Sequence, residues 1–474
     1  MTNRILIFAL LCLTVACSGS NNIKKENINR GEDLDFVIGH PEITFSAFAF
    51  VGEDNNNYIS VVSDLTYGSL VYTHNNDSTR ANIEYEVQIK PQGKDAASNL
   101  KRDRFVSEIS TADRSAWRSQ DKLKVEKDYR VEPGDYEVVF SARDLNSGKS
   151  TVRRDEVSIP DVAENEYEIS GIQIYTKDNE TSDGWLPVSS YHIRGNADSL
   201  RFVFQVMSGF SENPMQITSR LLRIASDTLH ADAMYYNRRG RSSIVYKGID
   251  YDKQEPIQTT RRTLETYENV FVEFVFPIQK RGNYRFETTA VRSETEERYK
   301  ARDFSIKSKN FPSVESTREM AAPLIYLMDK KKHREMMAIE DNDSLKNAID
   351  RFWLEDTKSE TKAREVISLY YQRVEEANKQ FSNFKEGWKT DAGYIYILFG
   401  PPWYVDQLSH DLIRWSYSFS SRNPEYTYFF EKPFVKQDAY PFTHYIFQRD
   451  RDFRQIEFRQ IDRWKNGTIL QTSI

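Results

Sequence analysis

Val131-Glu132-Pro133-Gly134-Asp135-Tyr136 is a Pro-Gly turn that leads into a strand opening with tyrosine. This arrangement resembles the tyrosine corner of Greek-key β-sandwiches, in which the phenol bonds to the backbone a few residues upstream. A hairpin signal at Asp144-Leu145-Asn146-Ser147-Gly148 and a return strand over Ser150–Ile159 come next. We therefore predict the last hairpin of an immunoglobulin-like sandwich here.

The same ending recurs at Lys280-Arg281-Gly282-Asn283-Tyr284, 148 residues further along when Gly134 is compared with Gly282. Each copy reaches an Arg-Asp pair about 20 residues later, Arg154-Asp155 in the first and Arg302-Asp303 in the second. We predict tandem sandwiches over residues 36–162 and 163–310. The alternative is chance similarity between two hairpins, because tyrosine corners are common in all-β domains.

After Phe311-Pro312 the hydrophobic period changes from two to 3.6, which predicts helices. We expect Asp343 to cap one helix, and Thr357 with Glu360 to form the capping box of a longer one. A strand is expected over 394–399. The whole chain is thus predicted to be multidomain and β-rich, with a helical segment plus a small α+β domain over residues 311–474.

A compact motif joins the long helix to that strand, and we expect Gly387 to stop the helix in a left-handed conformation. Thr390 and Asp391 are expected to bond nearby amides in a turn. A catalytic interpretation would make Thr390 a nucleophile and Asp391 a base, but no partner that activates the hydroxyl is identifiable. We therefore interpret the motif as structural, with a possible interaction role. Its residues are Gly387, Trp388, Thr390, Asp391, Gly400, Pro401 and Pro402.

These residues, with Arg373, Ala377, Asn378 and Phe381 upstream and Trp415-Ser416-Tyr417 downstream, make residues 320–474 resemble the GWxTD-domain family of exported bacterial proteins. The family more often carries arginine after the aspartate of the motif, where this chain has Ala392. The resemblance implies a location and a domain identity. It implies no activity.

The N-terminus reads as an export signal: Arg4, an apolar run over 5–13, and Leu13-Thr14-Val15-Ala16-Cys17. This end resembles the bacterial lipoprotein signal, so we expect removal of residues 1–16 and acylation of Cys17. The alternatives are an uncleaved signal anchor and an ordinary signal peptide with a chance cysteine. Residues 17–35 are polar and predict a flexible tether. A serine, Ser18, follows the cysteine, which resembles the signal that sorts lipoproteins to the outer membrane. We expect the protein on the periplasmic face of that membrane, with the cell surface as the alternative.

Composition excludes several classes of function. A net charge of −6 over 474 residues offers no basic field, so we expect no nucleic-acid partner. The two cysteines, Cys12 and Cys17, both fall at the signal, which leaves no thiol for a disulfide. The seven histidines show no ligand spacing, so no metal or cofactor is expected.

Aromatic residues are dense between Tyr417 and Phe447 and could either pack a core or face outward as an interaction surface. From these features we expect a non-enzymatic binding or scaffolding subunit, anchored at the outer membrane and holding an envelope protein. The alternative is an envelope hydrolase or a protein that binds or processes glycans.

Overall fold

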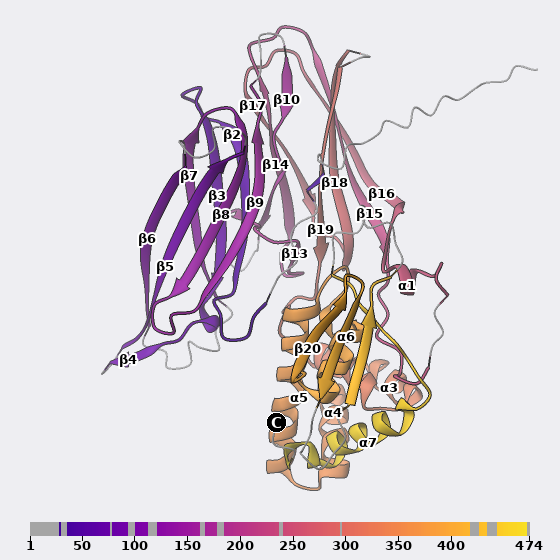
Figure 1. The fold of residues 1–474 in the computed structure, drawn as a ribbon. Helices are drawn as coiled ribbons and strands as arrows, with labels where there is room; N and C mark the ends of the chain where they lie inside the picture. The colour runs from indigo at the N-terminus through magenta and orange to yellow at the C-terminus, as the bar shows by residue number, and fades with distance from the viewer. Residues whose placement is uncertain are drawn as a thin grey trace, which may run out of the picture.

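The computed structural model describes residues 28–29, 36–75, 78–92, 100–111, 121–161, 166–177, 184–236, 240–293, 296–417, 426–433 and 443–471. Two β-sandwiches lead into a mixed helical and sheet domain, which lies below the second sandwich in Figure 1. The proposed signal, Cys17 and Ser18 fall outside the described residues. Of the expected tether, β1 (Ile28–Asn29) is described, and it pairs in parallel with β19.

The first sandwich packs a three-stranded sheet against a five-stranded one. The smaller sheet has the order β2-β3-β7, and the larger has the order β4-β5-β8-β9 with β6 also paired to β5. The strands are β2 (Ile43–Val51), β3 (Asn57–Thr66), β4 (Thr73–Asn75), β5 (Ser78–Pro91), β6 (Lys101–Thr111), β7 (Lys122–Val131), β8 (Gly134–Asp144) and β9 (Ser150–Ile159). Alternate residues of β5, such as Tyr85 and Val87, are buried between the sheets because side chains alternate along a strand.

The second sandwich has one sheet in the order β1-β19-β18-β15-β16, with β13 on β19, and another in the order β10-β14-β11-β12, with β17 on β14. Its strands are β10 (Tyr167–Ile169), β11 (Gln173–Lys177), β12 (Leu186–Pro187), β13 (His192–Ile193), β14 (Ser199–Ser208), β15 (Met215–Ser226), β16 (Ile249–Leu264), β17 (Val270–Pro277), β18 (Gly282–Ser293) and β19 (Glu296–Ile306), with a short α1 (Ile244–Lys247) before β16. Phe202 and Phe286 stack across the core with ring centroids 4.2 Å apart.

Both predicted tyrosine corners are confirmed. The Tyr136 hydroxyl donates to the Glu132 carbonyl at 2.6 Å, and the Tyr284 hydroxyl donates to the Lys280 carbonyl at 2.6 Å. The glycine that opens each corner strand has a positive φ, 150° at Gly134 and 157° at Gly282, which favours glycine. The two hairpins therefore repeat one local structure.

The Arg-Asp pairs of the two hairpins do not coincide in register. Asp155 lies opposite Val138, four residues after Gly134, whereas Arg302 lies opposite Phe286, four residues after Gly282. Both pairs follow their glycine at the same spacing, so it is the strand pairing that is shifted by one residue, and this shift puts an acid in the first copy where the second has a base. Asp155 and Arg302 interact electrostatically where the two sandwiches meet.

The C-terminal domain wraps helices around one buried helix and a small antiparallel sheet. Its helices are α2 (Thr317–Ala321), α3 (Lys330–Met337), α4 (Asn342–Thr357), α5 (Glu360–Phe381), α6 (Asp391–Phe399) and α7 (Phe453–Asn466), with 3-10 turns η4 (Ala322–Tyr326), η5 (Gly387–Lys389) and η7 (Thr468–Gln471). The sheet has the order β20 (Tyr404–Ser409), β21 (Leu412–Tyr417), β22 (Tyr426–Glu431) and β23 (Ile446–Phe447).

Residues Tyr394–Phe399 were expected to form a strand, and this prediction is wrong: they belong to α6. All nine residues of α6 are buried, so the helix has no polar face and shows no 3.6-residue pattern. Its aromatic and β-branched residues favour strands by propensity. Tertiary burial overrides that local preference.

The two predicted helix caps are also displaced. Asp341, rather than Asp343, caps α4, because its carboxylate accepts from the Ser344 amide at 2.8 Å. Thr357 is the last residue of α4 and its hydroxyl donates to the Trp353 carbonyl, so Ser359 caps α5 instead. Each helix is present, but its boundary lies about two residues from the expected cap.

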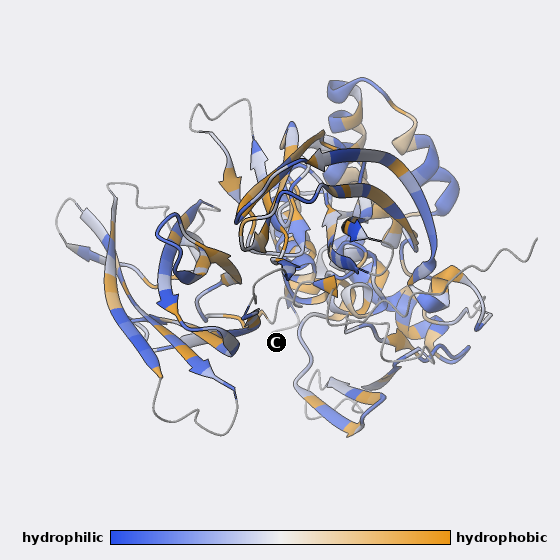
Figure 2. Cartoon of the chain, turned by 90° about the horizontal axis from the view of Figure 1, so that it is seen from above, coloured by the Kyte–Doolittle hydropathy of each residue, from blue (hydrophilic) through white to orange (hydrophobic). Residues whose placement is uncertain are grey.

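The three parts hold one another through side chains. Gln205 of the second sandwich exchanges two hydrogen bonds with the Val51 backbone of the first, at 2.7 and 2.8 Å. The loop after β15 enters the C-terminal core, where Ala231 and Met234 are buried. Figure 2 shows the three parts from above. None of the helices in these ranges has the length and apolarity needed to cross a membrane.

Candidate functional site

The motif around Gly387 lies where α5, η5 and α6 pack backbone against backbone. A Cβ on Gly387 would lie 1.9 Å from the Ala377 carbonyl oxygen, and one on Gly393 would lie 1.9 Å from the Gly387 carbonyl oxygen. Gly387 has no positive φ, so its expected left-handed role is wrong. Glycine is needed here because two helices approach more closely than any side chain allows.

Trp388 fixes the short η5 turn against its neighbours. The Trp388 amide donates to Asn378 Oδ1 at 3.1 Å, and the Trp388 carbonyl accepts from the Tyr326 hydroxyl at 2.7 Å. The indole Nε1 donates to Glu386 Oε2 at 3.2 Å. Every polar group of this buried tryptophan is therefore hydrogen-bonded within the domain.

Thr390 and Asp391 begin the buried helix rather than a strand. Thr390 Oγ1 accepts from the Gly393 amide at 3.0 Å, as a helix cap does, and donates to the Gly387 carbonyl at 2.7 Å. Both residues are 2% exposed. The Thr390 hydroxyl is engaged as donor and acceptor, an arrangement that favours a structural role over a nucleophilic one.

Asp391 forms a buried two-point ion pair with Arg449. Its Oδ1 accepts from Arg449 Nη2 at 2.7 Å and its Oδ2 from Arg449 Nη1 at 2.8 Å, while the Phe447 amide also donates to Oδ2 at 2.9 Å. Burial lowers the pKa of Arg449, but Asp391 more than offsets that effect and the pKa is raised. The negative charge also lies at the helix N-terminus, where the macrodipole favours it.

Arg449 extends this network into the second sandwich. Its Nε donates to the Ala233 carbonyl and its Nη2 to the Asp232 carbonyl, both at 3.1 Å. The motif aspartate is thereby coupled through one arginine to the loop that follows β15. Nothing in the sequence pattern identified Arg449, because it lies 58 residues from Asp391 and follows no motif.

Gly400-Pro401-Pro402 ends the same helix. Gly400 has φ 86°, and a Cβ there would lie 2.8 Å from the Arg373 guanidinium. Arg373 is buried and donates to the Ile397 carbonyl at 3.2 Å, so it caps the negative end of α6. Pro401 and Pro402 have no amide hydrogen to donate, so they cannot extend the helix. The motif residues therefore secure both ends of α6.

Immediately after these prolines, the chain exposes apolar side chains on an edge strand. Four of them lie on or beside β20: Trp403, Tyr404, Val405 and Leu408, which are 54%, 65%, 58% and 48% exposed. Strand β20 pairs only with β21, so among the described residues no strand covers its other edge. This strand was not predicted from the sequence, since its apolar residues are adjacent rather than alternating.

Several side chains of the aromatic-rich segment between Tyr417 and Phe447 pack in the core of the C-terminal domain. Tyr417, Tyr428, Phe430 and Phe447 are each at most 3% exposed, and their rings contact one another. Dense packing is thus confirmed for these residues. Three further aromatic residues of this segment, Tyr426, Phe429 and Tyr445, are only partly buried. The remaining ones, Phe419, Phe434, Tyr440 and Phe442, lie outside the described residues.

Metal ligands do not gather in the described ranges: no group of three or more His, Cys, Asp or Glu side chains there could hold an ion. A cavity of about 600 Å³ lies elsewhere, where the two sandwiches meet α5. It was not foreseen, because its lining comes from segments far apart in the chain.

The GWxTD domain model matches residues 288–466. The match begins within β18 and covers β19 and the helices and sheet that follow, so it includes the whole motif. This chain therefore carries a GWxTD domain. No curated protein matches the sequence.

Solved structures share only remote similarity with the chain. Native Escherichia coli alpha-2-macroglobulin is 14% identical with a TM-score of 0.19, covering 58% of this chain and 16% of that one. A Salmonella alpha-2-macroglobulin variant is 17% identical with a TM-score of 0.18, covering 57% and 17%. Red sea bream transglutaminase is 7% identical with a TM-score of 0.18, covering 56% and 31%. This chain thus spans less than a third of each, and such scores carry no argument about function.

Proposed function

Because residues 288–466 match the GWxTD domain, we propose that this chain is an outer-membrane lipoprotein, a non-enzymatic binding or scaffolding subunit of a cell-envelope assembly. Lipid on Cys17 holds it at the membrane, with the periplasmic face favoured, since two or three acyl chains anchor a protein durably. Strand β20 receives a protein partner. The exposed apolar edge of β20 is the observation that carries the proposal.

An open, apolar edge strand is unusual in a stable monomer. Natural sheets protect their edges with charges, prolines or covering elements, because unpaired backbone groups recruit other strands. Here Tyr404 and Val405, on opposite faces of β20, are both more than half exposed. Such a strand fits an extended peptide segment, which adds a strand and rests its side chains on the apolar ones.

The residues at the end of the motif hold strand β20 in a fixed position. Gly400 and the two prolines place β20 directly after α6, and the Tyr417 hydroxyl on β21 donates to the Gly400 carbonyl at 2.9 Å. The amide of Trp403 donates to the Ser416 carbonyl at 2.9 Å. A preorganised strand loses less entropy on binding, which favours affinity. The motif thus supports the site by positioning it.

Site-specific photocrosslinking tests this function. A photoreactive residue at Tyr404, in cells that carry the protein, is expected to give one discrete adduct with an envelope protein. Phe210 on the second sandwich is a matched control, because it is 66% exposed against 65% for Tyr404. Adducts of equal yield at both positions, or none at Tyr404, would contradict the proposal. Capture of a glycan instead would favour the polysaccharide-binding alternative.

A further inference from the structure

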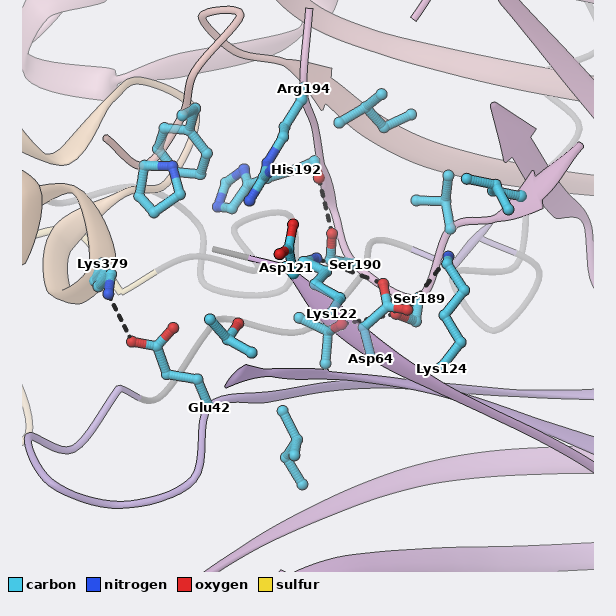
Figure 3. A pocket seen from close by; sticks show the side chains of 18 of the residues that line it. Glu42, Asp64, Asp121, Lys122, Lys124, Ser189, Ser190, His192, Arg194 and Lys379 are labelled. Atoms are coloured by element: carbon cyan, nitrogen blue, oxygen red, sulfur yellow. Dashed lines mark hydrogen bonds and ion pairs between the residues drawn. The ribbon is translucent and has the colours of Figure 1, made fainter. Parts of the chain in front are cut away.

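The cavity of about 600 Å³ lies where all three parts of the molecule meet. Figure 3 shows side chains from the first sandwich, from the segment around β13 and from α5 facing the same space. Its size falls in the range of roughly 300 to 1,000 Å³ typical of small-molecule sites. A ligand here would contact three parts at once.

Basic groups outnumber acidic ones around the cavity. Five are basic, namely Lys122, Lys124, Arg153, Arg194 and Lys379, and three are acidic, namely Glu42, Asp64 and Asp121. Two of the acids are already paired: Glu42 with Lys379 at 2.8 Å, and Asp64 with Lys122 at 3.4 Å and Lys124 at 3.3 Å. The lining therefore carries an excess of positive charge.

Arg194 is acted on by the charges of Asp64, Glu315 and Asp121, but it touches none of them. Its guanidinium forms no ion pair within 4.0 Å with any acid in the described part of the chain. Burial lowers the pKa of Arg194, and burial also lowers that of Lys122, to which the nearby Arg194 charge adds repulsion. Two neighbouring, partly dehydrated cations favour an incoming anion, since it would relieve both penalties.

The remaining wall is apolar. Phe36, Ile43, Leu186, Val188, Ile193 and Phe311 line the cavity beside the charged groups. Ligand sites commonly combine such walls with a few converging polar groups. The lining thus matches a molecule with one anionic end and one hydrocarbon end.

We propose that this cavity binds a small organic anion in which a carboxylate or phosphate monoester is joined to an aliphatic chain. The anionic head lies against Arg194 and Lys122, and the chain lies along Leu186, Val188 and Phe311. Bound in this way, the ligand fastens the sandwiches to the C-terminal domain. This site is independent of strand β20 and of the function proposed for it.

Calorimetric titration tests the site with decanoate, decyl phosphate and decan-1-ol as probes. The protein is the chain from residue 17 with Cys17→Ala, which keeps every described residue and requires no detergent. At least one of the anions should bind saturably at one site per chain, and decan-1-ol at least about tenfold more weakly, because charged hydrogen bonds contribute that much. The preferred anion identifies the head group. Equal binding of the alcohol, or no saturable binding of either anion, would overturn the proposal.

Variants separate a binding role from a structural one. Arg194→Gln should weaken anion binding about tenfold, whereas Lys346→Gln, on the exposed face of α4, should leave it unchanged. Leu186→Trp fills the cavity without removing charge and should also abolish binding. Melting temperatures without ligand show whether each variant is folded. Wild-type affinity in both folded Arg194→Gln and folded Leu186→Trp would refute the site.

Discussion

Asp391 and Arg449, 58 residues apart in the chain, meet through two hydrogen bonds of 2.7 and 2.8 Å with both side chains at most 2% exposed. This pair joins the start of α6 to the segment before α7. Through the carbonyls of Asp232 and Ala233, it also joins the C-terminal domain to the second sandwich. The aspartate of the motif is thus a tertiary anchor.

Removing one partner of this pair should destabilise the C-terminal domain strongly. We expect Asp391→Asn or Arg449→Met to lower the free energy of unfolding by about 3 to 5 kcal/mol, because the remaining group stays buried without its counterion. The double variant should cost less than the sum of the two single ones. Urea unfolding followed by tryptophan fluorescence measures both.

The exposed pair of Asp406 and Arg414 is the matched control. It has a similar separation of 2.8 Å, but its side chains are 44% and 41% exposed. Asp406→Asn should therefore cost at most about 1 kcal/mol, because solvent screens the pair. Equal losses at Asp391 and Asp406 would contradict the anchoring role.

Gly387→Ala should disrupt the packing of η5 against α5. The added methyl group would lie 1.9 Å from a backbone oxygen, which cannot move aside as a flexible side chain can. We expect the free energy of unfolding to fall by about 1 to 3 kcal/mol, the usual cost of overpacking. Gly209→Ala is the control, since a Cβ there meets nothing within 4 Å. Thermal unfolding distinguishes the two; comparable melting temperatures would argue against close packing as the reason for glycine.

Lys307 should make stability depend on pH between about 7 and 10.5. Burial lowers its pKa from 10.5 to about 7, although its ammonium donates to the Asn383 carbonyl at 2.6 Å. In this range the unfolded chain binds more protons than the folded one, so stability rises with pH. The gain is on the order of 1 kcal/mol per pH unit.

Lys307→Met removes the titrating group and should abolish that part of the slope. Chemical unfolding at pH 7, 8 and 9 compares the two proteins, and the difference in unfolding free energy should shift in favour of the wild type as pH rises. Parallel curves would show that Lys307 has an ordinary pKa in the folded protein. Lys346→Met, at an exposed position on α4, controls for the loss of a lysine.

Cys17→Ala should release the protein from the membrane fraction, because no acyl chain can then be attached. Cys12→Ala lies in the apolar part of the same segment and leaves the residue proposed for acylation intact. Fractionation followed by immunoblotting compares the variants. Retention of Cys17→Ala in membranes to the same extent as Cys12→Ala would mean that another feature anchors the chain.

Local signals were sufficient for the β-rich part of the fold. A Pro-Gly turn, a tyrosine and a hairpin turn determine each tyrosine corner within about six residues, so the bonds of Tyr136 and Tyr284 could be predicted. The amphipathic α5 could also be predicted, because its buried stripe includes Val366, Tyr370 and Val374.

The candidate site could be predicted only in part from such local signals. Its motif residues were identified, but Thr390 and Asp391 were expected in a turn before a strand, whereas they start α6. A helix buried on every side has no periodic pattern, and its sequence then favours a strand. Strand β20 carried no signal of exposure, since apolar residues appear equally in cores and on open edges.

The repeated corners, the helical region and the motif could thus be identified from the order of the residues, because each depends on residues close together in the chain. Tertiary structure alone decided that Tyr394–Phe399 is helical, that Arg449 is the partner of Asp391, and that Arg194 and Lys122 face one cavity. Those outcomes depend on burial and on contacts between distant segments. Such contacts leave no periodic or local trace in the order of the residues.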